Sequence, residues 1–265
     1  MSPLSRDRYI AVLGASGVGL GRRQGRETLW LGSVGFIDEG FQAWSVALDT
    51  LDRLLGEHCP AAAQLSVVVS AHFSRFCLVP WSEQITRPDE LLGFARLCFE
   101  DLYGTADQPW ELTLSPEPAG CDRIAAALPR ALLERLRGVA SGRRLRLSSV
   151  QPYLMAAFNH FDKQLDAGDL LFVVAEPVRS VLLLARAGRW AAVRSVGSSD
   201  SDAALGALIA RESHLQAASS ERPLTLYLHA PARLESPAQV AGVRVLDAAG
   251  SGSRDSLHAM SRAVA

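Results

Sequence analysis

Three short strand-like segments followed by an amphipathic helix occur twice in this chain, and this repeat constrains the fold more than any other feature. The first three strands are expected within residues 9–34 and the second three within residues 170–195, joined by turns rich in glycine or containing proline. Further strand and helix patterns follow each set. Because each unit can form a mixed sheet flanked by helices, the sequence predicts an α/β protein of two βββαβαβα halves.

The two predicted halves differ in one place. An inserted segment at about 71–121 adds a strand, a helix and the strand Trp110–Leu114 to the first half. The regular alternation is expected to resume with a strand at 123–128. The halves are therefore predicted at 1–167 and 168–265, and the first contains a small α+β insertion.

Capping residues predict where two of the helices begin and end. Asp38 is placed to start the first helix and Gly56 to end it. In the inserted segment, Thr86 and Asp89 have the spacing of a capping box, and Gly104 is placed to close the helix. The apolar face of this inserted helix is expected to consist of Leu91, Ala95, Cys98 and Leu102.

Composition excludes several functional classes. With 265 residues, a formal net charge of −1 and 48% hydrophobic residues, the chain can bury a core but has no basic excess for nucleic acid or anionic lipid. Its longest apolar runs are strand-length and its beginning lacks the pattern of a signal peptide, so we expect a cytoplasmic protein. The four cysteines form no C-x-x-C pair, which favours reduced thiols over a zinc site or disulfides.

Familiar catalytic motifs are absent from the sequence. The only lysine is Lys163, which excludes a Walker loop with its Gly-Lys-Ser/Thr. The six histidines form no H-x-x-H or H-E-x-x-H pair. The segment "GASGVGLG" fits neither a dinucleotide loop nor a serine elbow, because each of those motifs leads into a helix and here a second strand is expected.

Four stretches carry a resemblance to a known family: "YIAVLGASGVGLGRR", "LSVVVSAHFSRFCLVPWSE" with the following "DELLGFARLCFEDLYG", "LRLSSVQPYLMAAFNHF", and "LLFVVAEPVRSVLLLARAGRW". In order and spacing they resemble the actin-like assembly proteins of type IV pili and type II secretion, the PilM and GspL families. The resemblance implies the actin-like ATPase fold, with two ribonuclease-H-like halves and an insertion in the first.

The first nucleotide-binding loop of that fold is degraded here. Members that bind nucleotide carry Asp-x-Gly-Ser/Thr in the first pair of strands, where the Asp helps to hold the metal and the small residues let backbone N–H groups reach phosphate. Aligning Gly14 with the family's glycine leaves only Gly14 and Ser16 in place, and Val12 occupies the position of the Asp.

The second loop has lost the same features. Aligning Arg179-Ser180 with the family pattern places Ala175 at the metal-binding Asp and Pro177 at the glycine, where proline removes a backbone donor. Glu176 is one residue away, and one step along a strand reverses the direction of a side chain. We therefore expect no cofactor, with ATP and Mg²⁺ as the alternative. The remnants of the nucleotide loops are Gly14, Ser16, Glu176, Arg179 and Ser180.

The resemblance also implies a partner. In these families the groove between the inserted subdomain and the first half receives the cytoplasmic N-terminal segment of an inner-membrane pilus or secretion protein. Aromatic residues and arginine are enriched at binding hot spots. In "LSVVVSAHFSRFCLVPW" we expect Phe76 and Leu78 to face the core. The residues predicted to bind the partner are Phe73, Arg75, Trp81 and Glu83.

The sequence therefore predicts a cytoplasmic actin-like scaffold, peripheral to the inner membrane through its partners and without nucleotide hydrolysis. A motor ATPase or a second copy of the chain are further expected partners, and nucleic acid is not. Two alternatives stay open: an ATPase with atypical phosphate loops, and an interaction module of another envelope system.

Overall fold

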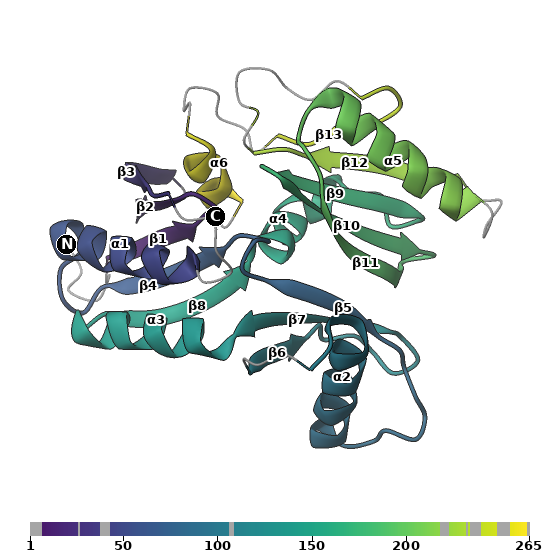
Figure 1. The fold of residues 1–265 in the computed structure, drawn as a ribbon, viewed down its shortest axis with the longest axis horizontal. Coiled ribbons are helices and arrows are strands. Elements are labelled where there is room, and N and C mark those ends of the chain that lie inside the picture. The colour runs from purple at the N-terminus through teal and green to yellow at the C-terminus, as the bar shows by residue number, and fades with distance from the viewer. Residues whose placement is uncertain are drawn as a thin grey trace.

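The structure is a computed structural model. It describes residues 7–25, 27–37, 43–105, 109–217, 223–231, 233, 240–247 and 255–263. Two five-stranded sheets and one three-stranded sheet make up the fold (Figure 1). None of the helices in these ranges is both long enough and apolar enough to cross a membrane.

The first sheet has the strand order β3-β2-β1-β4-β8. Its first three strands form the predicted antiparallel meander, and β1 then pairs in parallel with β4, as β4 does with β8. Since β8 pairs only with β4 among the described strands, its outer edge is open. The strands are β1 (Arg8–Leu13), β2 (Gly17–Gln24), β3 (Glu27–Gly35), β4 (Gln64–Val69) and β8 (Arg146–Pro152).

The second sheet repeats this arrangement with the order β11-β10-β9-β12-β13. The directions of pairing are also the same, antiparallel in the meander and parallel beyond it. The matching order confirms the predicted internal repeat. The strands are β9 (Leu170–Glu176), β10 (Arg179–Arg186), β11 (Arg189–Gly197), β12 (Thr225–His229) and β13 (Arg244–Val245). The described residues between β12 and β13 contain no helix.

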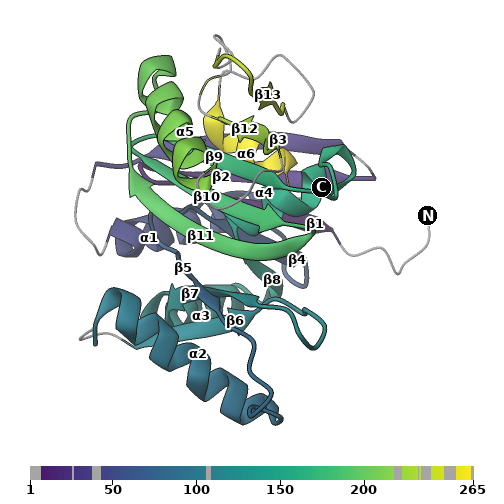
Figure 2. The same ribbon diagram turned by 90° about the vertical axis from the view of Figure 1, so that its right-hand side faces the viewer.

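The helices divide into an outer and an inner set. Alternate residues of β1 explain the division: Ala11 packs into the core beneath the outer helices, whereas Ile10 and Val12 face the core between the two sheets. Figures 1 and 2 show α4 and α6 between the sheets. The outer helices are α1 (Ala43–His58) and α3 (Arg130–Gly142) on the first sheet and α5 (Asp202–Ala217) on the second; the inner helices are α4 (Tyr153–Phe161), followed by a 3₁₀ turn at Asp162–Gln164, and α6 (Ser256–Arg262).

The inserted subdomain is a three-stranded antiparallel sheet with one helix. Its strand order is β5-β7-β6, and its core contains Cys77, Ala95 and Phe99. The elements are β5 (Arg75–Val79), α2 (Pro88–Tyr103), β6 (Trp110–Leu114) and β7 (Arg123–Pro129). Figure 1 shows this subdomain at the bottom right, below the second sheet.

One strand lies in a different sheet from the one we predicted. The strand expected at 123–128 was assigned to the regular alternation of the first half, but β7 is the central strand of the inserted sheet and pairs with both β5 and β6. The inserted sheet therefore extends to Pro129 rather than to about 121. Strand periodicity predicts that a segment is a strand but does not say which neighbours it pairs with, which is why the prediction was wrong.

Helix ends differ from the predictions by a turn or less. The first helix runs past Gly56 to His58, and its predicted start at Asp38 lies outside the described residues. The N-cap of α2 is Arg87 rather than Thr86, because proline at the first helical position fixes where the helix begins. Gly104 closes α2 as predicted, with a φ of 77°.

The apolar face of α2 also differs at its last turn. Leu102 is 59% exposed, and Phe99 is buried in its place. Phe99 packs against the rings of Tyr103 and Trp110, with centroid distances of 4.7 and 5.4 Å. The predicted positions Leu91, Ala95 and Cys98 do belong to this core. The difference teaches that an aromatic side chain three residues earlier can replace a leucine at the end of a helical stripe.

Candidate functional site

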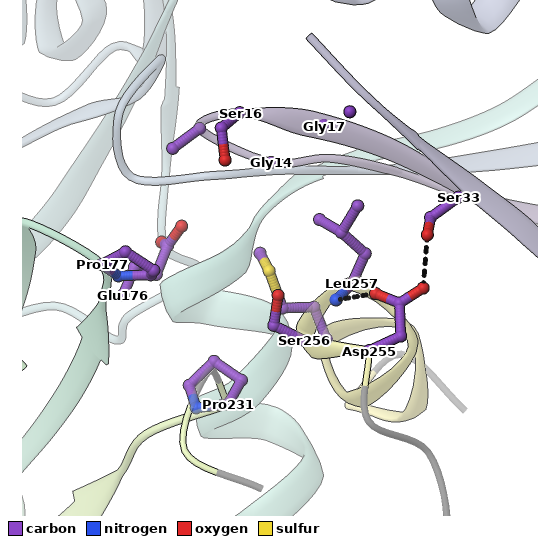
Figure 3. Close-up of a pocket in the computed structure, with 13 residues that line it drawn as sticks. Gly14, Ser16, Gly17, Ser33, Glu176, Pro177, Pro231, Asp255, Ser256 and Leu257 are labelled. Atoms are coloured by element: carbon purple, nitrogen blue, oxygen red, sulfur yellow. Dashed lines mark hydrogen bonds between the residues drawn. The ribbon is translucent and has the colours of Figure 1, made fainter. Parts of the chain in front are cut away.

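The remnants of the nucleotide loops meet at a small cleft between the two halves. The β1–β2 turn, the β9–β10 turn and the start of α6 surround a pocket of about 160 Å³ (Figure 3). Gly14, Ser16 and Glu176, which the sequence predicted as loop residues, all line it. The volume lies below the roughly 300 Å³ at which ligand pockets for small molecules begin. The cleft is therefore present, but it has little room.

A leucine fills the position where small residues would let the backbone approach phosphate. Gly14, Gly17 and Gly19, here called the glycine cradle, all face the side chain of Leu257 from α6. A Cβ atom on Gly14 would collide with Leu257, and one on Gly19 would collide with the Trp30 ring. The glycines are thus required for close packing of the chain's own side chains.

Asp255 holds α6 against the first sheet. Its carboxylate accepts hydrogen bonds from the Leu257 backbone N–H at 2.9 Å, from the Trp30 indole N–H at 3.0 Å and from the Ser33 hydroxyl at 2.5 Å. His258 then stacks on Trp30 with ring centroids 4.8 Å apart. The sequence analysis missed these residues. Its only signal was the run of glycines, which indicates a close approach without saying what approaches.

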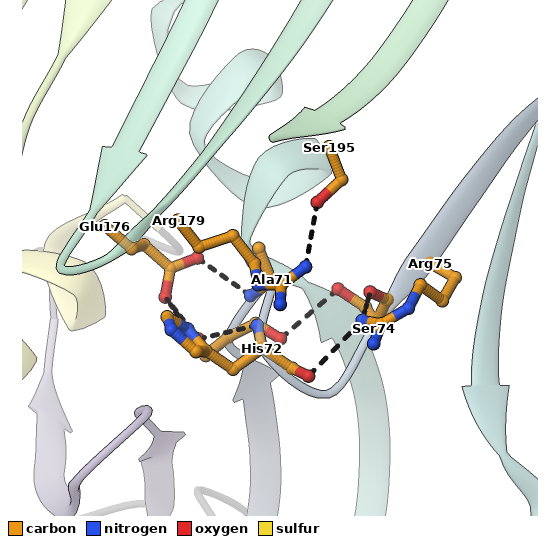
Figure 4. A network of polar contacts seen from close by, with 8 residues as sticks. Ala71, His72, Ser74, Arg75, Glu176, Arg179 and Ser195 are labelled. Carbon is orange, nitrogen blue, oxygen red and sulfur yellow. Dashed lines mark hydrogen bonds and ion pairs between the residues drawn. The ribbon is translucent and has the colours of Figure 1, made fainter. Parts of the chain in front are cut away.

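Glu176 is engaged within the protein. Its buried carboxylate accepts hydrogen bonds from the Ser70 hydroxyl and, at 2.8 Å, from the Ala71 N–H (Figure 4). The Ser70 hydroxyl also lies 3.0 Å from Nδ1 of His72. This carboxylate therefore joins β9 of the second half to the segment that leads from β4 into the inserted subdomain. Within the described ranges, no three His, Cys, Asp or Glu side chains gather in a way that could hold a metal ion.

Arg179 and Ser180 do not line the cleft. The Arg179 guanidinium donates to the Ser195 hydroxyl at 3.2 Å, and Ser180 is buried within β10. The turn that precedes them contains Val178 at a φ of 63°, a left-handed conformation that is unfavourable for a β-branched residue. Three of the five predicted loop residues, Gly14, Ser16 and Glu176, therefore meet at the cleft. The other two lie in the adjoining strand β10.

A buried polar pair lies deeper between the halves. The hydroxyl of Tyr153 on α4 lies 2.6 Å from Nε2 of His229 at the end of β12, and Nδ1 of His229 lies 2.9 Å from the Leu246 carbonyl oxygen. The carbonyl can only accept, so Nδ1 carries the proton and Nε2 accepts from tyrosine. Burial lowers the pKa of His229 to about 4. The imidazole is therefore neutral and fully hydrogen-bonded at neutral pH.

A larger depression of about 710 Å³ lies between the first half and the inserted subdomain. It runs along the open edge of β8 and is bounded by β6, β7, α3 and α4; we call it the β8 groove. Its apolar lining includes Ile124, Ala126, Leu128, Leu133, Val150 and Met155. Arg137, Gln151 and Asn159 add polar groups, and Arg137 forms no ion pair with any described residue. The groove thus combines apolar area, a free cation and an unpaired strand edge.

The four residues predicted to bind a partner lie outside this groove. Phe73 is only 5% exposed and packs in the core under α1, so its prediction as a contact residue was wrong. Arg75 is half-buried, donates to the Ser74 carbonyl at 2.9 Å and lies over the Trp110 ring. Trp81 is 41% exposed and lines a separate pocket of the inserted subdomain, and Glu83 is exposed. Phe76 is buried as predicted, whereas Leu78 is half-buried.

The groove could not have been found from a local motif. Its lining comes from five separate elements, and its most informative feature, the open edge of β8, depends on strand order. The misassigned sheet of β7 hid it further, because β7 supplies the groove with Ile124, Ala126 and Leu128.

Comparison with known proteins agrees with this architecture. No protein family model matches the sequence, and no curated protein matches it. A solved structure from Bacteroides thetaiotaomicron, a protein with actin-like ATPase fold and unknown function, is similar with a TM-score of 0.56 and 8% identity, over 85% of this chain and 81% of that one. The chain has the actin-like ATPase fold. The fold predicted from the sequence is thereby confirmed.

A second solved structure matches nearly the whole chain. The cytoplasmic domain of EpsL, an inner-membrane component of the type II secretion system of Vibrio cholerae, is similar with a TM-score of 0.56 and 10% identity, over 97% of this chain and 94% of that one. The PilM–PilN type IV pilus biogenesis complex matches 72% of this chain and 62% of that one at 16% identity, but its TM-score of 0.49 is too low to carry weight. At these identities the likeness establishes the fold and no more.

Proposed function

We propose that this chain is an actin-like scaffold of a type IV pilus or type II secretion platform at the cytoplasmic face of the inner membrane. It binds an extended segment of a membrane protein in the β8 groove and does not hydrolyse nucleotide. The observation that carries the proposal is the open edge of β8 beside a groove of about 710 Å³. The structural likeness to the cytoplasmic domain of EpsL supports the choice of system.

Strand addition is the binding mode that fits the groove. An extended peptide can pair its main chain with the free N–H and C=O groups of a sheet edge while alternate side chains enter pockets. The seven residues of β8 offer an edge of about 20 Å, which suits a segment of about six residues. Apolar side chains of the segment would pack on Ile124, Ala126 and Met155, and an acidic group would pair with Arg137.

The nucleotide cleft supports the second part of the proposal. Ala175 and Val12 stand where the fold's metal-binding carboxylates would be, and alanine and valine have no side-chain oxygen ligands for Mg²⁺. Leu257 fills the glycine cradle, and Glu176 is committed to Ser70 and Ala71. To hold Mg-ATP here, the protein would have to displace Leu257. The two carboxylates that line the cleft, Glu176 and Asp255, would have to give up hydrogen bonds that they accept within the protein.

Calorimetric titration tests the proposal. Peptides from the cytoplasmic segments of neighbouring inner-membrane proteins are titrated into the protein, and Mg-ATP is titrated separately. We expect one peptide to bind in a one-to-one ratio and Mg-ATP to give no binding heat. Saturable Mg-ATP binding would contradict the proposal and favour an ATPase with atypical loops.

Reversing the charge of Arg137 tests whether the peptide binds in the groove. Arg137→Glu should weaken peptide binding about tenfold. The substitution replaces a positive side chain by a negative one, which would repel the acidic group of the peptide. Arg211→Glu makes the same change on α5, outside the groove, and should leave the affinity unchanged. If both variants bind the peptide with equal affinity, Arg137 does not belong to the binding site.

A further inference from the structure

One side chain of the second half contacts two segments that contribute to the lining of the β8 groove. Trp190, in β11, donates its indole N–H to the Glu117 carboxylate at 2.7 Å. The same ring packs edge-on against Phe158 of α4, with ring centroids 5.1 Å apart. Glu117 belongs to the β6–β7 loop, and Phe158 belongs to α4. Both segments contribute residues to the groove lining.

Glu117 is connected to the groove lining through its neighbours in the loop. Ser115 and Pro116, immediately before it, line the groove. Glu117 donates its N–H to the Ser115 carbonyl at 3.0 Å, and Ser115 exchanges two hydrogen bonds with Ile124 on the groove floor, at 2.9 Å between backbones and 3.0 Å to its hydroxyl. A short chain of hydrogen bonds therefore joins the indole to Ile124, which is part of the groove lining. A movement of Glu117 would move this part of the lining with it.

The contact with Phe158 reaches the part of the lining that α4 provides. Phe158 lies on α4 between Met155 and Asn159, which both line the groove. It also packs edge-on against Phe172 of β9, with centroids 5.6 Å apart. The second sheet thus supports α4 through aromatic contacts, and Trp190 is one of the rings that provide them.

The hairpin that carries Trp190 has a second tie to the inserted subdomain. The Arg189 guanidinium donates to the carbonyl oxygen of Gly120 at 3.3 Å, in the same β6–β7 loop. The charge-assisted bond of Trp190 to Glu117 is the shorter of the two. Arg189 and Trp190 both donate hydrogen bonds to the β6–β7 loop, so the position of this loop depends on the position of the β10–β11 hairpin.

We propose that Trp190 is a positioning residue for the β8 groove. It fixes the spacing between the β6–β7 loop and α4, so the shape of the groove depends on the second half of the molecule. By linkage, a ligand that binds only one spacing also biases the placement of the second half. The part of this inference that concerns ligand binding rests on the proposed function. The part that concerns the shape of the groove does not.

Hydrogen exchange of the ligand-free protein tests the positioning role. Trp190→Phe keeps an aromatic ring against Phe158 and removes the N–H donor to Glu117. We expect amides in residues 113–117 and 124–126 to exchange roughly tenfold faster, because exchange reports the local opening that the lost bond permitted. Ile209→Val removes one methyl group from the outer core of the second half and should leave these amides unchanged. Unchanged exchange at both segments in a folded Trp190→Phe protein would overturn the proposal.

The acceptor can be varied in the same experiment. Glu117→Gln retains an oxygen acceptor, so its exchange should be closer to that of the wild type than the exchange of Glu117→Ala. If Glu117→Ala behaves as the wild type does, the indole does not act through Glu117. A role limited to overall stability would instead speed exchange throughout the second half in every variant.

Peptide titration separates this inference from the proposed function. With a peptide that binds the wild-type protein, Trp190→Phe should bind about fivefold more weakly, and Ile209→Val should bind as the wild type does. Equal affinities for the wild type and Trp190→Phe would contradict coupling between the groove and the second half. If no peptide binds the wild type, the proposed function fails, while the exchange experiment still decides the positioning role.

Discussion

The cleft between the halves and the β8 groove are both places where separate parts of the chain meet, but one is filled and the other is open. In the cleft, Leu257 occupies the glycine cradle and Asp255 satisfies three donors. Along β8, an apolar lining and a strand edge have no partner among the described residues. The comparison teaches that the place where a fold usually binds its ligand need not be the most open surface of a given member. Here the β8 groove is more open than the cleft between the halves.

The difference has a physical cause in each region. Packing Leu257 against three glycines removes apolar surface from water and leaves a cleft of only about 160 Å³. An exposed strand edge, by contrast, presents main-chain N–H and C=O groups that water can hydrogen-bond and that another strand can pair with. The cleft therefore contributes to the stability of the protein, and the groove remains available for a partner.

The largest expected effect on stability comes from acidification of the buried pair that joins the halves. The pKa of His229 is about 4 in the folded protein and about 6.5 when unfolded, so the unfolded chain binds the proton first as pH falls. Stability from this group is complete above pH 6.5 and is lost as pH falls to 4, by about 3 kcal/mol. Urea unfolding at pH 7 and at pH 4.5 measures the loss.

A variant isolates the contribution of His229 from that of other groups. His229→Gln removes the titrating imidazole while keeping a hydrogen-bonding side chain, so its stability should change less between the two pH values. An equal change in the wild type and the variant would show that other groups carry the pH dependence.

The second prediction breaks the filled cleft by adding one methyl group. Gly19→Ala should destabilise the protein by about 2 kcal/mol, because the new Cβ would overlap the rigid indole of Trp30. Gly35→Ala is the control in the same cleft, since its nearest neighbour would be the Ser16 carbonyl oxygen at 3.7 Å. Thermal unfolding of both variants makes the comparison. Two equally stable variants would mean that the cradle is not closely packed.

The third prediction empties the cradle instead of overfilling it. Leu257→Ala should cost about 1.5 kcal/mol, which is less than a fully buried leucine would cost, because Leu257 is half-buried. The same substitution at Leu215, which is 45% exposed on α5, should have little effect. Peptide affinity should not change in either variant. We expect Leu257→Ala still to bind no Mg-ATP, because room alone does not replace the missing carboxylates.

The smallest expected effect is a gain in stability at the β9–β10 turn. Val178→Gly should stabilise the protein by up to about 1 kcal/mol, because glycine adopts the positive φ without strain and Val178 is 72% exposed. Val245→Gly, in β13, should destabilise instead, since an extended strand gains nothing from glycine. Thermal melting distinguishes the two. A loss of stability in Val178→Gly would mean that valine makes contacts that outweigh the strain.

The repeat was predictable because it depends on local patterns. Alternating apolar residues and turn residues are encoded within each segment, so the two meanders and the principal helices follow from the sequence. Which strands pair is a matter of long-range packing, and the sheet assignment of β7 shows the limit of local patterns. The glycine cradle shows a further limit: the sequence identified Gly14 as a remnant of a nucleotide loop, and only the fold shows that Leu257 packs against it.

The predicted partner residues show the same limit. Phe73, which was predicted to contact a partner, is buried, and Phe76, which was predicted to face the core, is buried as well. Trp81 is exposed as expected, but it lies at a different pocket from the β8 groove. Residue type alone therefore did not locate the groove, because the groove arises from the order of the strands.

Hydrogen exchange of β8, measured with the peptide and separately with Mg-ATP, tests the central claim most directly. The account predicts that the peptide protects amides within residues 147–151, where a new strand pairs with the open edge, and that Mg-ATP leaves residues 14–17 unchanged. Protection of residues 14–17 by Mg-ATP, with no change along β8 when the peptide is present, would contradict the account.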